Sequence, residues 1–204
     1  MTEASTSAIL DWASAGRPLK GETESGDLHV VAPFDGGALV AAIDGLGHGP
    51  DAALAARAAA GVLAAHPSDA LVQLVEWCHE ALRKTRGVVL TLASFRSRSA
   101  ELTWMGIGNV EGLLLRADSR RPADTALLRG GVVGFRLPAF RETTVSLSWG
   151  DTLVLATDGI RGGFSRGLTA AESPAHLCGS ILAEHGKISD DAMVLVARYI
   201  GGSA

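Results

Sequence analysis

The most regular feature of the chain is a series of short apolar segments that stop at Gly, Asp, Ser or Asn. Segments of this length, rich in Val, Leu, Ile and Thr and bounded by turn residues, are typical of buried β-strands. They predict strands at residues 28–34, 38–43, 88–95, 100–107, 110–116, 152–157 and 192–199. Two weaker patterns predict further strands near 7–13 and 143–148.

Two helical patterns lie between the second and third of these strands. Pro50 and Asp51 are typical of a first helical turn, and an alanine-rich body follows them. After Pro67, Ser68 or Asp69 is expected to cap a second helix. Its apolar positions recur at the three- and four-residue spacing of one buried face. These positions are Leu71, Leu74, Val75, Cys78 and Leu82.

The arrangement of the elements indicates an α+β fold. A third helix is expected at about 172–186, so helices are grouped apart from strands that tight turns connect. This order favours layered antiparallel sheets over a doubly wound parallel sheet. The 204 residues contain no linker long enough to divide them, which predicts a single domain over residues 1–204.

Composition removes several classes of function. The net charge of -4 comes without a basic stripe, which argues against a nucleic-acid partner. No segment approaches the roughly 18 apolar residues of a membrane span, and the N-terminus lacks a signal-peptide pattern. Cys78 and Cys178 are far apart and favour neither a disulfide framework nor a local zinc site. We therefore expect a reduced, cytoplasmic protein with no membrane partner.

Aspartates occupy the ends of apolar strands in the N-terminal half. The segments 27–34 and 38–44 are joined by an Asp-Gly-Gly turn of the kind that closes hairpins. Antiparallel pairing of the two segments places Asp27 across from Asp44 and Gly45. Two carboxylates are then expected at one edge of a sheet.

The C-terminal half repeats this pattern. One strand ends on Asp158-Gly159, and the last strand begins just after Asp190-Asp191. If these strands are also antiparallel, their acids meet at one edge. If the two edges coincide, four or five aspartates gather in one place.

A cluster of this kind cannot stay fully ionised without a cation, because like charges at close range are costly. Carboxylate oxygens suit Mg²⁺ or Mn²⁺ better than zinc. Two such ions can hold a bridging hydroxide and a phosphate. Gly45 would leave its carbonyl free to complete a metal shell.

Simpler interpretations of the same residues stay open. An isolated Asp-Gly pair is usually a turn, Asp190-Asp191 could cap the entry to a strand, and Asp27 could be a solvated edge residue. His48 could be a catalytic acid or base, or equally a polar residue at a helix start. Asn109 is expected in a tight turn between strands, and the alternative that it faces the site is less favoured.

Four motifs together resemble those of PPM-type (protein phosphatase 2C-like) serine/threonine phosphatases, in the bacterial branch that includes SpoIIE, RsbU and RsbX. They are GETESGD at 21–27, DGLGHG at 44–49, LVLATDGI at 153–160 and ISDDAMVLV at 188–196. The resemblance spans nearly the whole chain in the family's order. We expect no sensor or activator domain beside the catalytic domain, and this architecture is similar to that of RsbX.

The resemblance implies a four-layer α-β-β-α sandwich of two antiparallel sheets flanked by helices, with two Mn²⁺ or Mg²⁺ ions at one end. Asp44 would bridge both ions, the Gly45 carbonyl would bind one, and Asp158 and Asp190 would ligate the ion at the core of the site. Asp27 would lie near the second ion, and the role of Asp191 stays open. The family's phosphate-binding arginine has no clear counterpart, and Arg17 is a candidate by position only.

The resulting hypothesis is a metal-dependent phosphatase with Asp44, Asp158 and Asp190 as catalytic residues. It would hydrolyse phosphoserine or phosphothreonine through a metal-bound hydroxide. The resemblance to RsbX implies phosphorylated STAS-domain proteins of a stressosome as partners. Two alternatives are a phosphatase acting on a small-molecule phosphoester and a catalytically silent binding module with the same fold.

Overall fold

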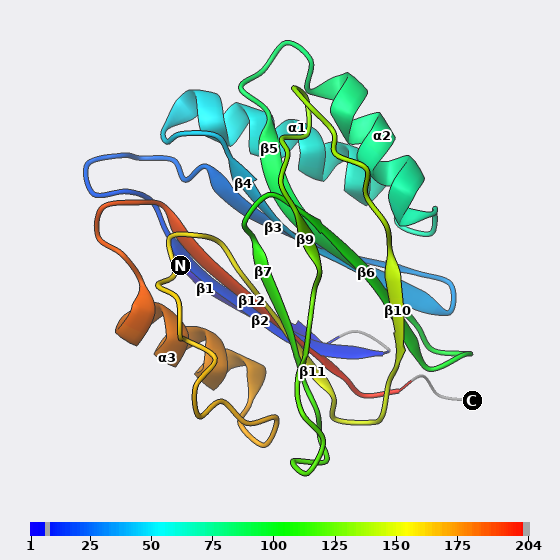
Figure 1. The fold of residues 1–204 in the computed structure, drawn as a ribbon. Helices are drawn as coiled ribbons and strands as arrows, with labels where there is room; N and C mark the ends of the chain where they lie inside the picture. Colours follow the sequence, from blue (N-terminus) through cyan, green and yellow to red (C-terminus); the bar gives the residue numbers. More distant parts are fainter. Residues whose placement is uncertain (7–8, 202–204) are drawn as a thin grey trace.

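The computed structural model describes residues 1–6 and 9–201, in which two β-sheets lie face to face between two layers of helices (Figure 1). The first sheet has the strand order β1-β2-β12-β11-β7-β8. Its strands are β1 (Thr2–Thr6), β2 (Leu10–Arg17), β12 (Ala192–Tyr199), β11 (Thr152–Ala156), β7 (Glu111–Leu115) and β8 (Asp124–Thr125).

The second sheet has the order β10-β6-β5-β4-β3, with β9 parallel to β6 and all other neighbours antiparallel. Its strands are β3 (Asp27–Phe34), β4 (Gly37–Gly45), β5 (Val88–Arg96), β6 (Glu101–Ile107), β9 (Leu128–Arg129) and β10 (Thr143–Ser146).

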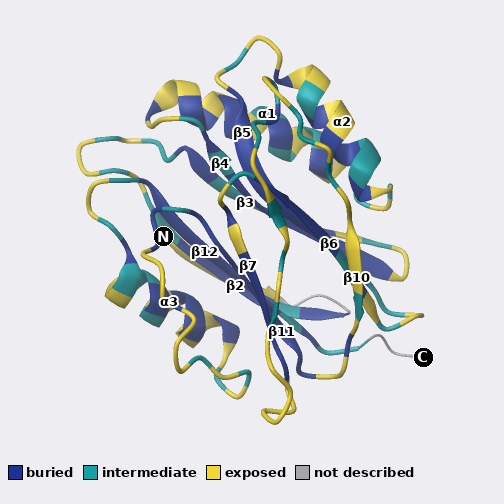
Figure 2. Ribbon diagram, in the orientation of Figure 1, coloured by how far each residue is buried: buried dark blue, intermediate teal, exposed yellow. Residues whose placement is uncertain are grey.

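Three separate apolar layers hold the sandwich together. One lies between the sheets, and includes Phe95, Trp104 and Leu195. A second joins the outer face of the second sheet to α1 (Pro50–Ala65) and α2 (Leu71–Ala81), and a third joins the first sheet to α3 (Pro174–His185). Figure 2 shows the buried sheets and the exposed outer faces of the helices. The expected four-layer α-β-β-α architecture is confirmed.

Each long segment that was predicted as a helix or a strand has that type in the structure. All the strongly patterned strands form, and the weak pattern at 143–148 contains β10. The other weak pattern, 7–13, falls partly on residues 7–8, outside the described residues, and its positions from Leu10 onward lie in β2, which continues to Arg17. Strands β1, β8 and β9 were not predicted, because they are short or polar.

The expected cap of α2 was wrong. The N-cap residue is Ala70, and no side chain caps the helix there. Ser68 and Asp69 instead belong to the preceding turn, where the main-chain N–H of Asp69 donates to the carbonyl of His66. The helix is stabilised by its buried face against the second sheet, so a side-chain cap is not required.

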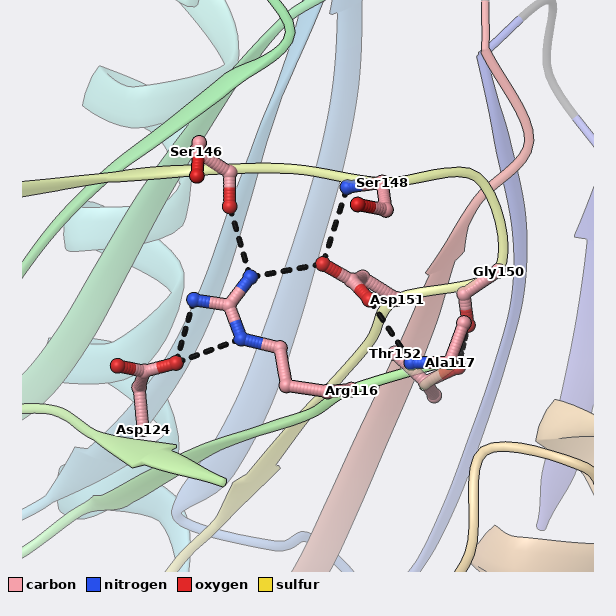
Figure 3. Close-up of polar contacts among 8 residues, drawn as sticks. All are labelled: Arg116, Ala117, Asp124, Ser146, Ser148, Gly150, Asp151 and Thr152. Atoms are coloured by element: carbon pink, nitrogen blue, oxygen red, sulfur yellow. Dashed lines mark hydrogen bonds and ion pairs between the residues drawn. The ribbon is translucent and has the colours of Figure 1, made fainter. Parts of the chain in front are cut away.

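A buried ion-pair cluster connects strands at the end of the sandwich where β7 ends and β11 begins (Figure 3). Arg116, 7% exposed, donates to Asp124 and to Asp151, with 2.7 Å from Nη1 to Asp151 Oδ2. Asp151, 1% exposed, also accepts the main-chain N–H groups of Ala117 and Ser148.

Within residues 1–6 and 9–201, no helix is long and apolar enough to cross a membrane.

Candidate metal centre

The β3–β4 hairpin places its two acids opposite one another. Asp27, the first residue of β3, pairs with Asp44, the penultimate residue of β4. This confirms the pairing expected from the Asp-Gly-Gly turn. The two residues occupy the edge of the second sheet from which the chain enters α1.

The β11–β12 pair brings a second set of acids to one edge of the first sheet. Its antiparallel register pairs Ala156 with Val194, and continues as the N–H of Thr157 donates to the carbonyl of Met193. The next residue, Asp158, therefore lies beside the start of β12. A Cβ built on Gly159 would lie only 1.8 Å from the carbonyl oxygen of Asp191, so the two segments approach closely at this point.

The two sheet edges coincide, which the sequence pattern alone left as an assumption. Thr157 Oγ1, from the first sheet, donates to Asp27 Oδ2, from the second, at 2.7 Å. Asp44, Asp158 and Asp190 line one cavity of about 350 Å³ at this end of the sandwich. Asp27 is buried and lines a second cavity, of about 330 Å³.

Burial and mutual repulsion disfavour ionisation of these carboxyl groups. Desolvation, followed by the charges of Asp158, Asp190 and Asp191, raises the pKa of Asp44 to about 7. Desolvation, followed by the charge of Asp44, raises the pKa of Asp27 well above its ordinary value. Desolvation, followed by the charge of Asp158, raises the pKa of Asp190. The site thus concentrates negative charge that a cation would stabilise.

Gly45 allows helix α1 to pack directly against the acidic edge. A Cβ at this position would lie 2.2 Å from the carbonyl oxygen of Ala52, in the first turns of the helix. The alanine-rich surface of α1 also contacts Gly26, where a Cβ would lie 2.8 Å from the Cβ of Ala52. The small residues in both segments therefore bring the helix and the two acid-bearing strands together.

Two polar side chains complete the lining of the main cavity. Asn109 Nδ2 donates to Asp158 Oδ2 at 2.8 Å, so the turn after β6 contributes a site residue that its sequence context only weakly suggested. His48 lines the cavity, 56% exposed, and its Nδ1 is 2.8 Å from Glu22 Oε1. Because a carboxylate only accepts hydrogen bonds, Nδ1 carries the proton and Nε2 is the nitrogen left for a substrate.

Arg17 occupies a different place from the one that phosphate binding would require. Its Nη2 donates to the carbonyl of Lys187 at 2.9 Å, and the residue lines the second cavity with Asp27. Lys187 in turn donates through Nζ to the main-chain carbonyl of Asp158. Arg17 therefore stabilises the segment before β12, and a contact with substrate phosphate has no support from its position.

The donor set suits a hard divalent cation. It consists of carboxylate oxygens, with main-chain carbonyls nearby, and burial makes their shared negative charge unfavourable without a counter-ion. Among the described residues, no group of three or more His, Cys, Asp or Glu side chains already has the arrangement of a metal site.

Comparison with known protein families shows to which family the chain belongs. The Stage II sporulation protein E (SpoIIE) family matches residues 35–200, which is most of the chain. The chain belongs to the SpoIIE family. No curated protein matches it.

Solved structures extend this result. The SpoIIE-family chain is similar to a chain in a solved structure described as "The bacterial stressosome: a modular system that has been adapted to control secondary messenger signaling". The two share 30% sequence identity over 93% of this chain and 99% of that one, with a TM-score of 0.84. RsbX in complex with magnesium has a TM-score of 0.85 and 17% identity over 98% of this chain and 100% of its own.

A third structure is the catalytic domain of the serine/threonine protein phosphatase PstP in complex with two manganese ions. It has a TM-score of 0.69 and 19% identity over 94% of this chain and 99% of its own. At such identities, the similarities to RsbX and PstP establish the fold. The predicted membership in the bacterial branch with SpoIIE and RsbX is confirmed.

Proposed function

We propose that this SpoIIE-family chain is a single phosphatase domain, over residues 1–204, that hydrolyses phosphoserine or phosphothreonine with two Mn²⁺ or Mg²⁺ ions. The observation that carries the proposal is the convergence of Asp44, Asp158 and Asp190 on one cavity, from separate segments of both sheets. Metal complexes of the structural relatives support the choice of ions. A cytoplasmic location stays a prediction of the sequence.

Different residues would hold each of the two ions. Asp44 would help to hold both ions, the Gly45 carbonyl would help to hold one of them, and Asp158 and Asp190 would hold the ion at the core of the site. Asp27 would lie near the second ion, and Asn109 would orient Asp158 through its 2.8 Å hydrogen bond. When bound, the ions would supply Lewis acidity at the phosphoryl group and activate water as a nucleophile.

We assign to His48 the role of general acid, which donates a proton to the leaving oxygen of the substrate. Glu22 holds Nδ1, so protonated His48 would donate from Nε2, within the cavity that the substrate phosphate would enter. The alternative role, a polar residue at the start of α1, does not require a carboxylate partner. The contact with Glu22 therefore supports the catalytic assignment.

The proposed substrate is a phosphorylated STAS-domain protein of a stressosome. This partner rests on the resemblance to RsbX and on the 30% identical relative from a stressosome system. A phosphoprotein surface also fits an open cavity in which the acids are partly exposed.

The deciding experiment is manganese-dependent phosphate release from a phosphorylated STAS protein, compared with release from p-nitrophenyl phosphate. We expect the wild type to prefer the phosphoprotein, and Asp44→Asn or excess chelator to abolish both activities. Preference for the small ester would indicate that the substrate is a small-molecule phosphoester and not a phosphoprotein. Equal rates for wild type and Asp44→Asn, or no activity on any phosphoester, would contradict the metal-dependent mechanism and favour a silent binding module.

A further inference from the structure

Asp191 is a buried carboxylate in the acidic cluster that the proposed metal ligands leave without a role. It is 3% exposed. Its Oδ1 accepts the main-chain N–H of Leu19 at 2.7 Å, and its Oδ2 accepts the main-chain N–H of Gly26 at 2.8 Å. Both carboxylate oxygens are thus used to hold the two ends of segment 19–26 against the start of β12.

The bond to Gly26 is connected to two of the proposed ligands. Gly26 directly precedes Asp27, and its carbonyl accepts the main-chain N–H of Gly45 at 3.0 Å. A Cβ on Gly26 would lie 3.0 Å from Asp191 Oδ2 and 3.2 Å from the carbonyl oxygen of Gly45. This close packing leaves Gly26 little freedom to move independently of Asp191, so the carboxylate fixes the main chain beside both Asp27 and Gly45.

The same segment also reaches the mouth of the cavity. Glu22 pairs with His48, and Glu24 Oε2 accepts a hydrogen bond from Arg57 Nη1 at 2.7 Å. Both of these pairs are at least partly exposed to solvent, and exposed ion pairs stabilise a loop only weakly. The buried bonds to Asp191 therefore provide the firmer attachment of the segment.

We propose that Asp191 is a positioning residue that fixes segment 19–26 and thereby sets Asp27 and Gly45 for binding of the second metal ion. The inference rests on the proposed function for its metal, and on the two main-chain hydrogen bonds for its mechanism. A carboxylate is required because it offers an acceptor to each N–H group. An asparagine would present its NH₂ group, a donor, to one of them.

The experiment combines hydrogen exchange with metal titration on the full chain. In chelator, NMR exchange of the Leu19 and Gly26 amides is compared for wild type, Asp191→Asn and Asp191→Ala. Mn²⁺ affinity is then measured by calorimetry. We expect faster exchange at both amides in Asp191→Ala and at one of the two in Asp191→Asn. The Mn²⁺ affinity should fall by about 10- to 100-fold, typical of groups that orient metal ligands, with Asn weaker in effect than Ala. If Asp191→Ala does not fold, Asp191→Asn decides alone.

Asp151→Asn is the matched control. Asp151 is an equally buried carboxylate that accepts two main-chain N–H groups, but it precedes β11 whereas Asp158 follows it. It should lower the unfolding temperature and leave Mn²⁺ affinity of the folded protein unchanged. Wild-type affinity in Asp191→Asn, or an equal affinity loss in Asp151→Asn, would overturn the inference.

The two levels of the proposal fail in different ways. A wild type that binds no Mn²⁺ or Mg²⁺ contradicts the proposed function and, with it, the role of Asp191 in metal binding. Unchanged exchange at Leu19 and Gly26 in the Asp191 variants contradicts the role of Asp191 in fixing segment 19–26, whatever the metal affinity. Faster exchange together with weaker binding supports both.

Discussion

Gly45 and Gly159 each follow a strand-ending aspartate, and at each a neighbouring main chain occupies the space of a side chain. A Cβ on Gly45 would collide with the carbonyl of Ala52, and one on Gly159 with that of Asp191. Real Cβ contacts essentially never fall below 3.0 Å, and both of these distances would be shorter. The Asp-Gly pairs therefore look like turns in the sequence but serve close packing at the site.

His48 gives the residue scale its sharpest prediction. His48→Gln should slow hydrolysis of a phosphoserine protein by about 10²–10⁴-fold, because the serine oxygen is a poor leaving group that needs a proton. Hydrolysis of p-nitrophenyl phosphate should change much less, since nitrophenolate leaves without one. Steady-state rates on the two substrates, at saturating Mn²⁺, provide the comparison.

Glu22→Gln serves as the companion variant for His48. It keeps the size of the side chain but weakens its hold on Nδ1, so it should shift the same ratio of rates in the same direction by a smaller factor. An equal loss on both substrates, or lower Mn²⁺ affinity in His48→Gln, would assign His48 to the structure of the metal site instead.

At the scale of elements, the Arg116 cluster holds the end of the sandwich opposite to the acids (Figure 3). Arg116→Met should lower the free energy of unfolding by about 3–5 kcal/mol, because it leaves the buried carboxylate of Asp151 without its cation. Urea denaturation measures this change. Mn²⁺ affinity should stay at its wild-type value.

Arg83→Met is the control for that variant. Arg83 pairs with Glu80 at the surface, and both side chains are mostly exposed. Removing such a pair changes stability by no more than about 1 kcal/mol. Similar losses in the two variants would mean that the Arg116 cluster is worth no more than a surface pair.

Hydrophobic pattern is sufficient to predict the long elements and the partners of the acids. The β3–β4 pairing follows from a short turn and a two-residue period, and these alone place Asp27 and Asp44 opposite each other. The cap of α2 could not be predicted, because Ser68 and Asp69 suit a turn as well as a cap. Asn109 has a side-chain role that depends on Asp158, far away in the sequence.

At the scale of the whole molecule, the hydrophobic pattern does not determine how the two sheets are stacked. Each half of the chain predicts its own pair of acids, but only the sandwich brings Thr157 to Asp27 and so aligns the two edges. The family resemblance supplied this arrangement, whereas periodicity could not. The hydrogen bonds of Asp191 to Leu19 and Gly26 likewise depend on contacts between distant segments.

The acidic cluster also predicts how the whole molecule responds to metal. Ions that bind only the folded state stabilise it by about 2.7 kcal/mol at a hundredfold excess over Kd. For a domain of this size, that energy corresponds to a rise of roughly 5–10 °C in unfolding temperature. Differential scanning fluorimetry of the wild type with Mn²⁺ or Mg²⁺ should show this rise, and chelator should reverse it.

Asp44→Asn separates a metal-binding role from a structural one. In chelator, the variant should unfold at the wild-type temperature or above it, because it removes a buried carboxylate whose ionisation the neighbouring acids oppose. Added Mn²⁺ should then raise its unfolding temperature far less than that of the wild type. If the variant is instead less stable in chelator, Asp44 contributes to the fold itself, since an acid kept only to bind metal costs stability when the metal is removed.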